Sequence, residues 1–176
     1  MLSWDEIWEL HKQEPQQQDL LVRAAILSYE CGKLSKAYYK LCGCPVDEHS
    51  SYLAEMKMEL ADIVCQLRLL CYVQNWSFDK LYFEVQCTCV DGSVTDKINT
   101  LINFAAQVLQ KAVYTKLSGH DKHINDAESY VREMIGLTQD IIQMIDLPFN
   151  LVSDLGKTRI KNAKIQLAFQ EEQQCH

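Results

Sequence analysis

The sequence predicts an all-α protein, a helical bundle of about seven helices. Of its 176 residues 48% are apolar, which is enough for one well-buried core. Glycine and proline are scarce, at 6 and 3 residues, whereas a sandwich or barrel needs turn residues roughly every 8–12 positions. Apolar residues also recur at helical spacing along several long segments. These three observations favour helices throughout.

The first half of the chain is expected to form four helices, at residues 4–12, 17–41, 50–74 and 79–89. Ser3 is a suitable N-cap for the first helix. Gly43 and Pro45 end the second helix, and Ser77 can cap the fourth. The third helix carries a long apolar pattern: Leu53, Met56, Leu60, Ile63, Val64, Leu67 and Leu70.

A break at Asp91-Gly92-Ser93 separates the second half, where helices are expected at residues 95–117 and 125–145 and from 147 onward. We therefore divide the chain into a unit at 1–92 and a unit at 93–176, packed as one compact domain. Residues 32–39 align with 107–114, and residues 76–79 align with 147–150. The second unit is thus a candidate degenerate repeat.

If the repeat is real, the second copy has lost its acidic residues. The alignment puts Ala105 where Glu30 would be and Tyr130 where Glu59 would be. The chain would then be a covalent pseudo-dimer in which only one half is chemically equipped.

The composition indicates a cytoplasmic protein. A formal net charge of −7 argues against a general nucleic-acid or anionic-membrane surface. We expect no signal peptide and no membrane span, because the start lacks a basic region and no apolar run is long enough. The eight cysteines are then ordinary thiols. Structural zinc on Cys42-Gly43-Cys44 and Cys87-Thr88-Cys89 remains an alternative, although this spacing is unusual for zinc.

Acidic residues in the second and third helices form the candidate site. Glu55, Glu59 and Asp62 are spaced by four and three residues, so they share one stripe of a helix. That stripe adjoins an apolar one, and carboxylates at the edge of a core cost free energy unless a cation compensates. The alternative is that they face solvent and pair with Lys57 or Arg68.

Two motifs lie on successive predicted helices: Tyr29-Glu30-Cys31-Gly32-Lys33-Leu34 and, 22 residues beyond Ala37, Glu59-Leu60-Ala61-Asp62-Ile63-Val64. Together they resemble the MazG-like all-α nucleoside triphosphate pyrophosphohydrolases. The family pattern is E-x-x-E on one helix and E-x-x-D on the next. The resemblance covers about residues 17–90. It implies Mg²⁺ on the carboxylates and hydrolysis of a (d)NTP to the monophosphate and pyrophosphate.

Carried over by position, Glu30, Glu59 and Asp62 would be metal ligands and catalytic residues, with Glu55 as an additional metal ligand. The family also places a Lys and an Asn in a later helix, toward the substrate. Lys161 and Asn162 are the candidates here, although a basic stripe near a helix end is more often a solvated face. Homodimers are usual among related bundles, so we expect a homodimer that binds a nucleotide.

Lys33 stands where the family has a carboxylate, a change of two charge units near the metal. Its ammonium could take part of the cation's place and leave an inactive, metal-free bundle. It could instead bind phosphate while Glu55 supplies the missing carboxylate, or it could lie at the surface. Two functions therefore remain open: a Mg²⁺-dependent pyrophosphohydrolase, and a catalytically degenerate bundle that serves as a binding or structural module.

Overall fold

The computed structural model describes residues 2–85 and 92–174, and it describes their side chains except at 15 and 164–174. Within these ranges the chain forms seven α-helices, two short 3₁₀ helices (Pro15–Gln18 and Val46–Glu48) and no strand. The predicted all-α class is confirmed. No helix in the described ranges has the length and apolarity needed to cross a membrane.

The α-helices are α1 (Trp4–His11), α2 (Leu20–Gly43), α3 (His49–Gln74), α4 (Phe78–Val85), α5 (Val94–Ser118), α6 (Lys122–Met144) and α7 (Phe149–Gln174). Ser3 caps α1 as expected, in a capping box with Glu6. The second helix begins three residues later than the sequence predicted. There the Asp19 carboxylate accepts a hydrogen bond from the Leu21 N–H at 2.7 Å. Residues 86–89 of the expected fourth helix lie outside the described residues.

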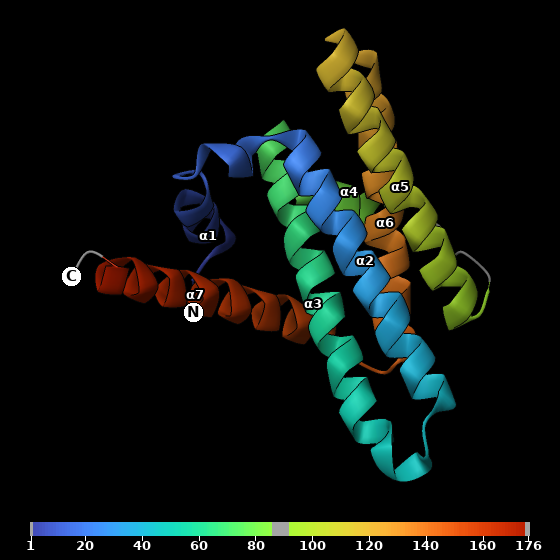
Figure 1. Ribbon diagram of the computed structural model, residues 1–176. Coiled ribbons are helices and arrows are strands. Elements are labelled where there is room, and N and C mark those ends of the chain that lie inside the picture. Colours follow the sequence, from blue (N-terminus) through green and yellow to red (C-terminus); the bar gives the residue numbers. More distant parts are fainter. Residues whose placement is uncertain (1, 86–91, 175–176) are drawn as a thin grey trace.

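Two long helical hairpins, α2–α3 and α5–α6, form the body of the molecule and pack against each other through α2 and α5 (Figure 1). The helix that follows each hairpin packs on the other hairpin. Thus α4 leaves α3 and packs on α6, whereas α7 leaves α6 and packs on α3. The buried apolar residues of both hairpins belong to one core, so the two halves are joined by an exchange of helices.

The ends of α3 and α6 repeat the same geometry. Asn75 and Asp146, which lie 71 residues apart, have φ of 61° and 57° and are the non-glycine residues with positive φ in the described part of the chain. Each precedes a residue whose N–H bonds back to the helix, from Trp76 to the Cys71 carbonyl and from Leu147 to the Ile142 carbonyl. Both ends are left-handed caps of the Schellman type.

The two exchanged helices also make equivalent close approaches. A Cβ added to Gly136 of α6 would lie 2.0 Å from Cγ1 of Val85 in α4. A Cβ added to Gly156 of α7 would lie 2.3 Å from Sγ of Cys65 in α3. Val85 and Gly156 are 71 residues apart, and so are Cys65 and Gly136. The same two positions therefore meet in both halves. The glycine belongs to the hairpin helix α6 in one contact and to the exchanged helix α7 in the other.

This spacing extends through the hairpins and corrects the alignment made from sequence. Lys40 pairs with Glu55, and 71 residues later Lys111 pairs with Asp126. In this register Leu101, rather than Ala105, is equivalent to Glu30. The sequence alignment of residues 32–39 was displaced by four residues, one helical turn, because apolar helix faces repeat at that interval. Tyr130 is equivalent to Glu59, as expected. The duplication itself stays a prediction.

Candidate metal centre

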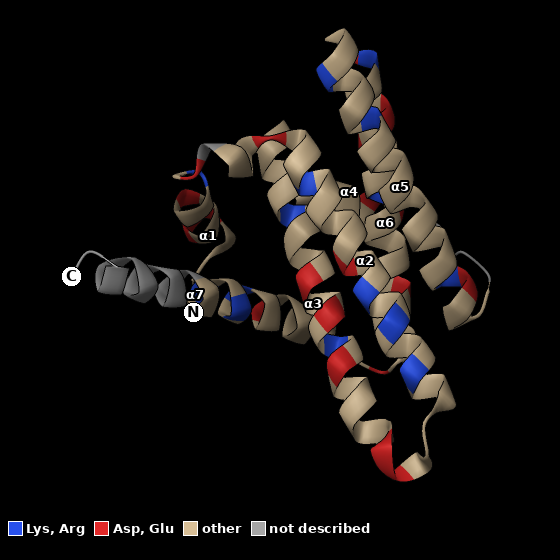
Figure 2. Ribbon diagram, in the orientation of Figure 1, with Lys and Arg blue, Asp and Glu red and all other residues tan. Residues whose placement is uncertain are grey.

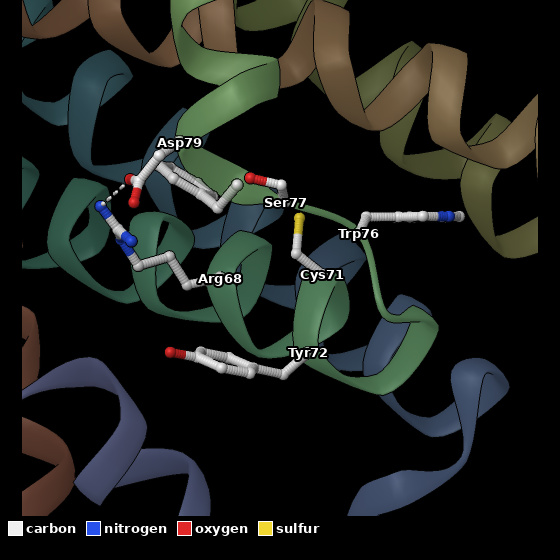
Figure 3. Close-up of a pocket in the computed structure, with 7 residues that line it drawn as sticks. Arg68, Cys71, Tyr72, Trp76, Ser77 and Asp79 are labelled. Carbon is white, nitrogen blue, oxygen red and sulfur yellow. Dashed lines mark hydrogen bonds and ion pairs between the residues drawn. The ribbon is translucent and has the colours of Figure 1, made fainter.

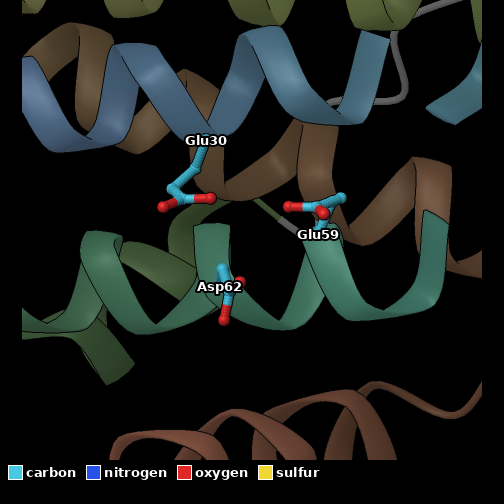
Figure 4. A group of neighbouring side chains, drawn as sticks. All are labelled: Glu30, Glu59 and Asp62. Carbon is cyan, nitrogen blue, oxygen red and sulfur yellow. The ribbon is translucent and has the colours of Figure 1, made fainter. Parts of the chain in front are cut away.

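Three carboxylates converge between the facing helices α2 and α3 (Figure 4). Glu30 comes from α2, and Glu59 and Asp62 come from successive turns of α3. One oxygen of each lies within 4.8 Å of the others. Glu59 is only 8% exposed, so the acids lie at the margin of the core. Figure 2 shows acidic segments of α3 next to basic segments of α2 along this seam.

Lys33 lies among the three carboxylates. Its Nζ is 2.6 Å from Glu59 Oε2, 2.9 Å from Glu30 Oε2 and 3.7 Å from Asp62 Oδ2. Although the Lys33 side chain is 30% exposed, these contacts hold it in the cluster, so the interpretation that it is displaced to the surface is wrong. An ammonium therefore takes the position in which a cation would contact all three acids.

Arg159 of α7 provides a second cation. Its Nε and Nη2 each donate to Asp62, both at 2.7 Å, in a bidentate pair. Two basic side chains thus offset two of the three negative charges of the cluster, and the bidentate geometry is the strongest form of such a contact. This pair also joins α7 to α3.

The pKa values of the cluster follow from burial and pairing. Burial raises the pKa of Glu30, and the carboxylates of Asp62 and Glu59 raise it further, whereas the hydrogen bond from Lys33 lowers it only in part. Burial disfavours the Lys33 ammonium, but hydrogen bonds to Glu59 and Glu30 outweigh it and raise the pKa of Lys33. The hydrogen bond to Asp62 likewise raises the pKa of Arg159. The cluster therefore holds both of its cations firmly.

The other residues that the sequence singled out lie apart from the cluster. Glu55 binds Lys40, at 2.8 and 3.0 Å, and so lies outside the group of three acids. Lys161 and Asn162 are exposed on α7. The alternative pairing of the acids with Arg68 is wrong, because Arg68 binds Asp79 instead, at 3.2 Å.

Sequence reasoning missed Arg159, although it considered its neighbours on the same helix. A signal was present in Gly156, one turn earlier in a long helix. A glycine within a helix indicates a close helix crossing, and a Cβ there would lie 2.8 Å from the Ala61 carbonyl oxygen of α3. Ala61 precedes Asp62, so the crossing that requires Gly156 also brings Arg159 to that carboxylate.

The equivalent position in the second hairpin is apolar. Phe104 and Tyr130, equivalent to Lys33 and Glu59, are in ring contact with centroids 5.6 Å apart. Leu101, equivalent to Glu30, is fully buried. Of the four positions only the one equivalent to Asp62 keeps an acid, Glu133. The loss of acids expected for the second half is therefore seen at the site itself.

The cysteine pairs form no metal group in the part of the chain that can be assessed. Cys42 is exposed and Cys44 is half-buried, near the end of α2. Among the described residues the three acids are the one group of His, Cys, Asp or Glu whose ligand atoms gather closely enough for a metal ion. Cys87 and Cys89 lie outside the described residues.

Comparisons of this chain with protein-family models, with curated proteins and with solved structures found no match. The likeness to MazG-like enzymes therefore depends on the two short motifs and on the helices that carry them.

The carboxylates suit a hard divalent cation in number and oxygen chemistry. Their arrangement with Lys33 does not suit one, because Mg²⁺ needs oxygen ligands at about 2.0–2.1 Å and the ammonium contacts the same oxygens. A metal ion and the Lys33 ammonium cannot share this position. With Lys33 in place, the residues present form an ion-pair cluster rather than a metal site.

Proposed function

We propose that this protein is a MazG-like helical bundle whose acidic site holds the Lys33 ammonium in place of a metal ion, and that it acts as a non-hydrolytic binding or interaction module. One observation carries the proposal: the contact of Lys33 Nζ with Glu30 and Glu59 at 2.9 and 2.6 Å. Arg159 supports it by taking both oxygens of Asp62.

In this proposal the cluster has a structural role. Lys33, Glu59 and Arg159 belong to α2, α3 and α7, so the charges tie three helices together near one surface. A tethered ammonium neutralises the acids permanently, whereas a metal ion would do so only when bound. The site then has no Lewis acid with which to polarise a phosphate or to activate water.

A pyrophosphohydrolase is the second candidate. The observation that favours it is the convergence of three carboxylate oxygens within 4.8 Å, together with the partial exposure of Lys33. If the Lys33 side chain moves toward solvent, Glu30, Glu59 and Asp62 would be the residues to hold Mg²⁺. The ion would neutralise the phosphates and lower the pKa of an attacking water. A nucleotide ligand, a homodimer and a cytoplasmic location belong to this candidate as predictions.

Thermal melting in Mg²⁺ or Mn²⁺ separates the two candidates. We expect the wild-type melting temperature to be unchanged at millimolar metal, and the Lys33→Glu variant to be stabilised by metal through mass action. Adding Glu59→Gln to Lys33→Glu should abolish that metal effect. The matched control is Lys111→Glu, which makes the same charge change in the second half and should create no metal dependence.

Pyrophosphate release from a panel of nucleoside triphosphates completes this test. The module proposal expects none from the wild-type chain. Metal-dependent stabilisation of the wild type, together with pyrophosphate release that Glu59→Gln abolishes, would establish the enzyme instead.

A further inference from the structure

A hollow lies where α1, α3, α4 and α7 meet, and none of its lining residues belongs to the acidic cluster. Its volume is about 490 Å³, within the range of roughly 300–1,000 Å³ that is typical of small-molecule sites. Trp4 of α1 and Arg68 of α3 line it together with residues of α4 and α7. Neither of the functions considered above uses this hollow.

The hollow lies between equivalent faces of the two exchanged helices. On α4 its lining residues are Asp79, Tyr82 and Phe83, and on α7 the residues 71 positions later, Asn150, Ser153 and Asp154, also line it. The two halves thus contribute the same three positions with different chemistry. On α4 two of these three residues are aromatic, whereas on α7 all three are polar. Phe149, at the start of α7, adds a ring to the aromatic wall.

The aromatic wall is a continuous set of rings. Tyr82 lies 4.9 Å from Phe149 and 5.8 Å from Phe83, measured between ring centroids. Aromatic faces of this kind bind planar rings by stacking. The polar wall opposite offers the amide of Asn150 and the hydroxyl of Ser153 to the edge of such a ring.

Arg68 supplies a donor without a partner. Its guanidinium lies 4.0 Å from the Phe78 ring centroid and 5.0 Å from that of Trp4. It pairs with Asp79, as Figure 3 shows in the smaller hollow that Arg68 also lines. The Arg68 Nε–H is buried and has no hydrogen-bond partner among the described residues. A buried donor left unpaired is costly, so a ligand acceptor here would remove that cost.

The charges around the hollow are arranged by depth. The cationic side chains are the buried ones, with Arg68 15% and Lys157 18% exposed. Their acidic partners lie at the rim, with Asp79 72% and Asp154 40% exposed. Water screens the exposed acids more than the buried cations, so the interior of the hollow favours an anion.

We propose that this hollow is a binding site for a small planar aromatic molecule that carries an oxyanion, either a carboxylate or a phosphate. The ring lies against Tyr82 and Phe149, and the oxyanion accepts hydrogen bonds from Lys157 Nζ and from the Arg68 guanidinium.

Binding is measured by isothermal titration of the full chain in EDTA and by the NMR shift of the Trp4 indole N–H. The probes are indole-3-acetate and adenosine 5′-monophosphate, which distinguish a carboxylate source from a phosphate source. Adenosine and inorganic phosphate test each part of the ligand alone. We expect at least one aromatic anion to saturate the Trp4 shift and to bind at least about 10-fold more tightly than either part.

Variants locate the contact. Arg68→Gln and Lys157→Gln should each weaken binding by about 10-fold, as expected for the loss of one charge-assisted hydrogen bond. Lys157→Gln maintains the test if Arg68→Gln fails to fold. Lys80→Gln, the same charge change on the exposed side of α4, should leave binding unchanged. The proposal is overturned if neither aromatic anion binds at millimolar concentration, if phosphate alone binds equally well, or if neither pocket variant weakens binding.

Discussion

Equivalent positions of the two hairpins lie 71 residues apart, and the hairpins differ most at the positions of the acidic cluster. In the α2–α3 hairpin Lys33 meets Glu59 at 2.6 Å. In the α5–α6 hairpin the equivalent residues, Phe104 and Tyr130, form a ring contact. The caps that end α3 and α6 are the same in both halves, and the helix crossings use the same two positions with the glycine on opposite partners. The backbone arrangement is therefore compatible with either an ionic or an aromatic pair at this position.

This difference shows which interactions helix pairing requires and which it does not. An aromatic pair stabilises a hairpin through burial, and it needs no partner beyond the pair itself. A cluster of three acids must be desolvated, and each acid then depends on a cation nearby. Because the second hairpin packs without such a cluster, the acids of the first hairpin are not required for helix pairing. One contact that they do make is between helices of different halves, because Asp62 of α3 binds Arg159 of α7.

The largest expected effect comes from removing the internal cation. Lys33→Met leaves three carboxylates with only Arg159 to compensate them. We expect a loss of about 2–3 kcal/mol in the free energy of unfolding, below the roughly 3–5 kcal/mol of a fully buried pair because Lys33 is 30% exposed. Urea denaturation measures this loss. Phe104→Met, the equivalent change in the second half, should cost less, about 1 kcal/mol.

Transplanting the second half's residues tests the same comparison in reverse. A triple variant, Glu30→Leu with Lys33→Phe and Glu59→Tyr, places the residues of the second hairpin in the first. We expect it to regain most of the stability that Lys33→Met loses, because an apolar set often replaces a buried ionic one at little cost. If the triple variant is less stable than Lys33→Met, the two positions are not equivalent in packing.

An intermediate effect is expected at the two glycine crossings. Gly156→Ala brings a Cβ against the Ala61 carbonyl oxygen, which is backbone, whereas Gly136→Ala meets only the Val85 side chain. Both should destabilise by about 1–3 kcal/mol, with Gly156→Ala the worse. Adding Val85→Ala should rescue Gly136→Ala in a denaturation double-mutant cycle, and Cys65→Ala should rescue Gly156→Ala only in part. Equal rescue would mean that the two crossings are alike.

The helices and their order were predictable because apolar periodicity, caps and turn residues are local signals. The start of α2 was predicted three residues too early, because Pro15–Gln18 forms a separate 3₁₀ helix and Asp19 then caps α2. Glu30, Glu59 and Asp62 were brought together correctly from their spacing on two adjacent helices. Such spacing is enough when a short loop makes the helices neighbours.

The cations that pair with these acids could not be predicted from spacing. They depend on the rotation of each helix and on contacts between segments far apart in the sequence. Lys33 had three open readings, because a small rotation of α2 would move it from the cluster to the surface. Arg159 lies 97 residues from Asp62 in sequence, and only the α3–α7 crossing joins them. The four-residue error in aligning α5 with α2 had a similar origin, since helical faces look alike after one turn.

The smallest expected effect concerns the pair that both halves retain, Lys40–Glu55 and Lys111–Asp126. Each joins the two helices of its hairpin near the surface, so we expect Lys40→Met and Lys111→Met each to lower the melting temperature by no more than about 2 °C.

The hydrogen bond from Lys111 lowers the pKa of Asp126. The stability from this pair is therefore present above the ordinary aspartate pKa and is lost as the pH falls through the lowered value. The melting difference between wild type and Lys111→Met should accordingly be present at neutral pH and vanish in strong acid. A difference that persists in acid would assign the effect to packing of the lysine stem, and the pair would then not be an electrostatic feature common to the two halves.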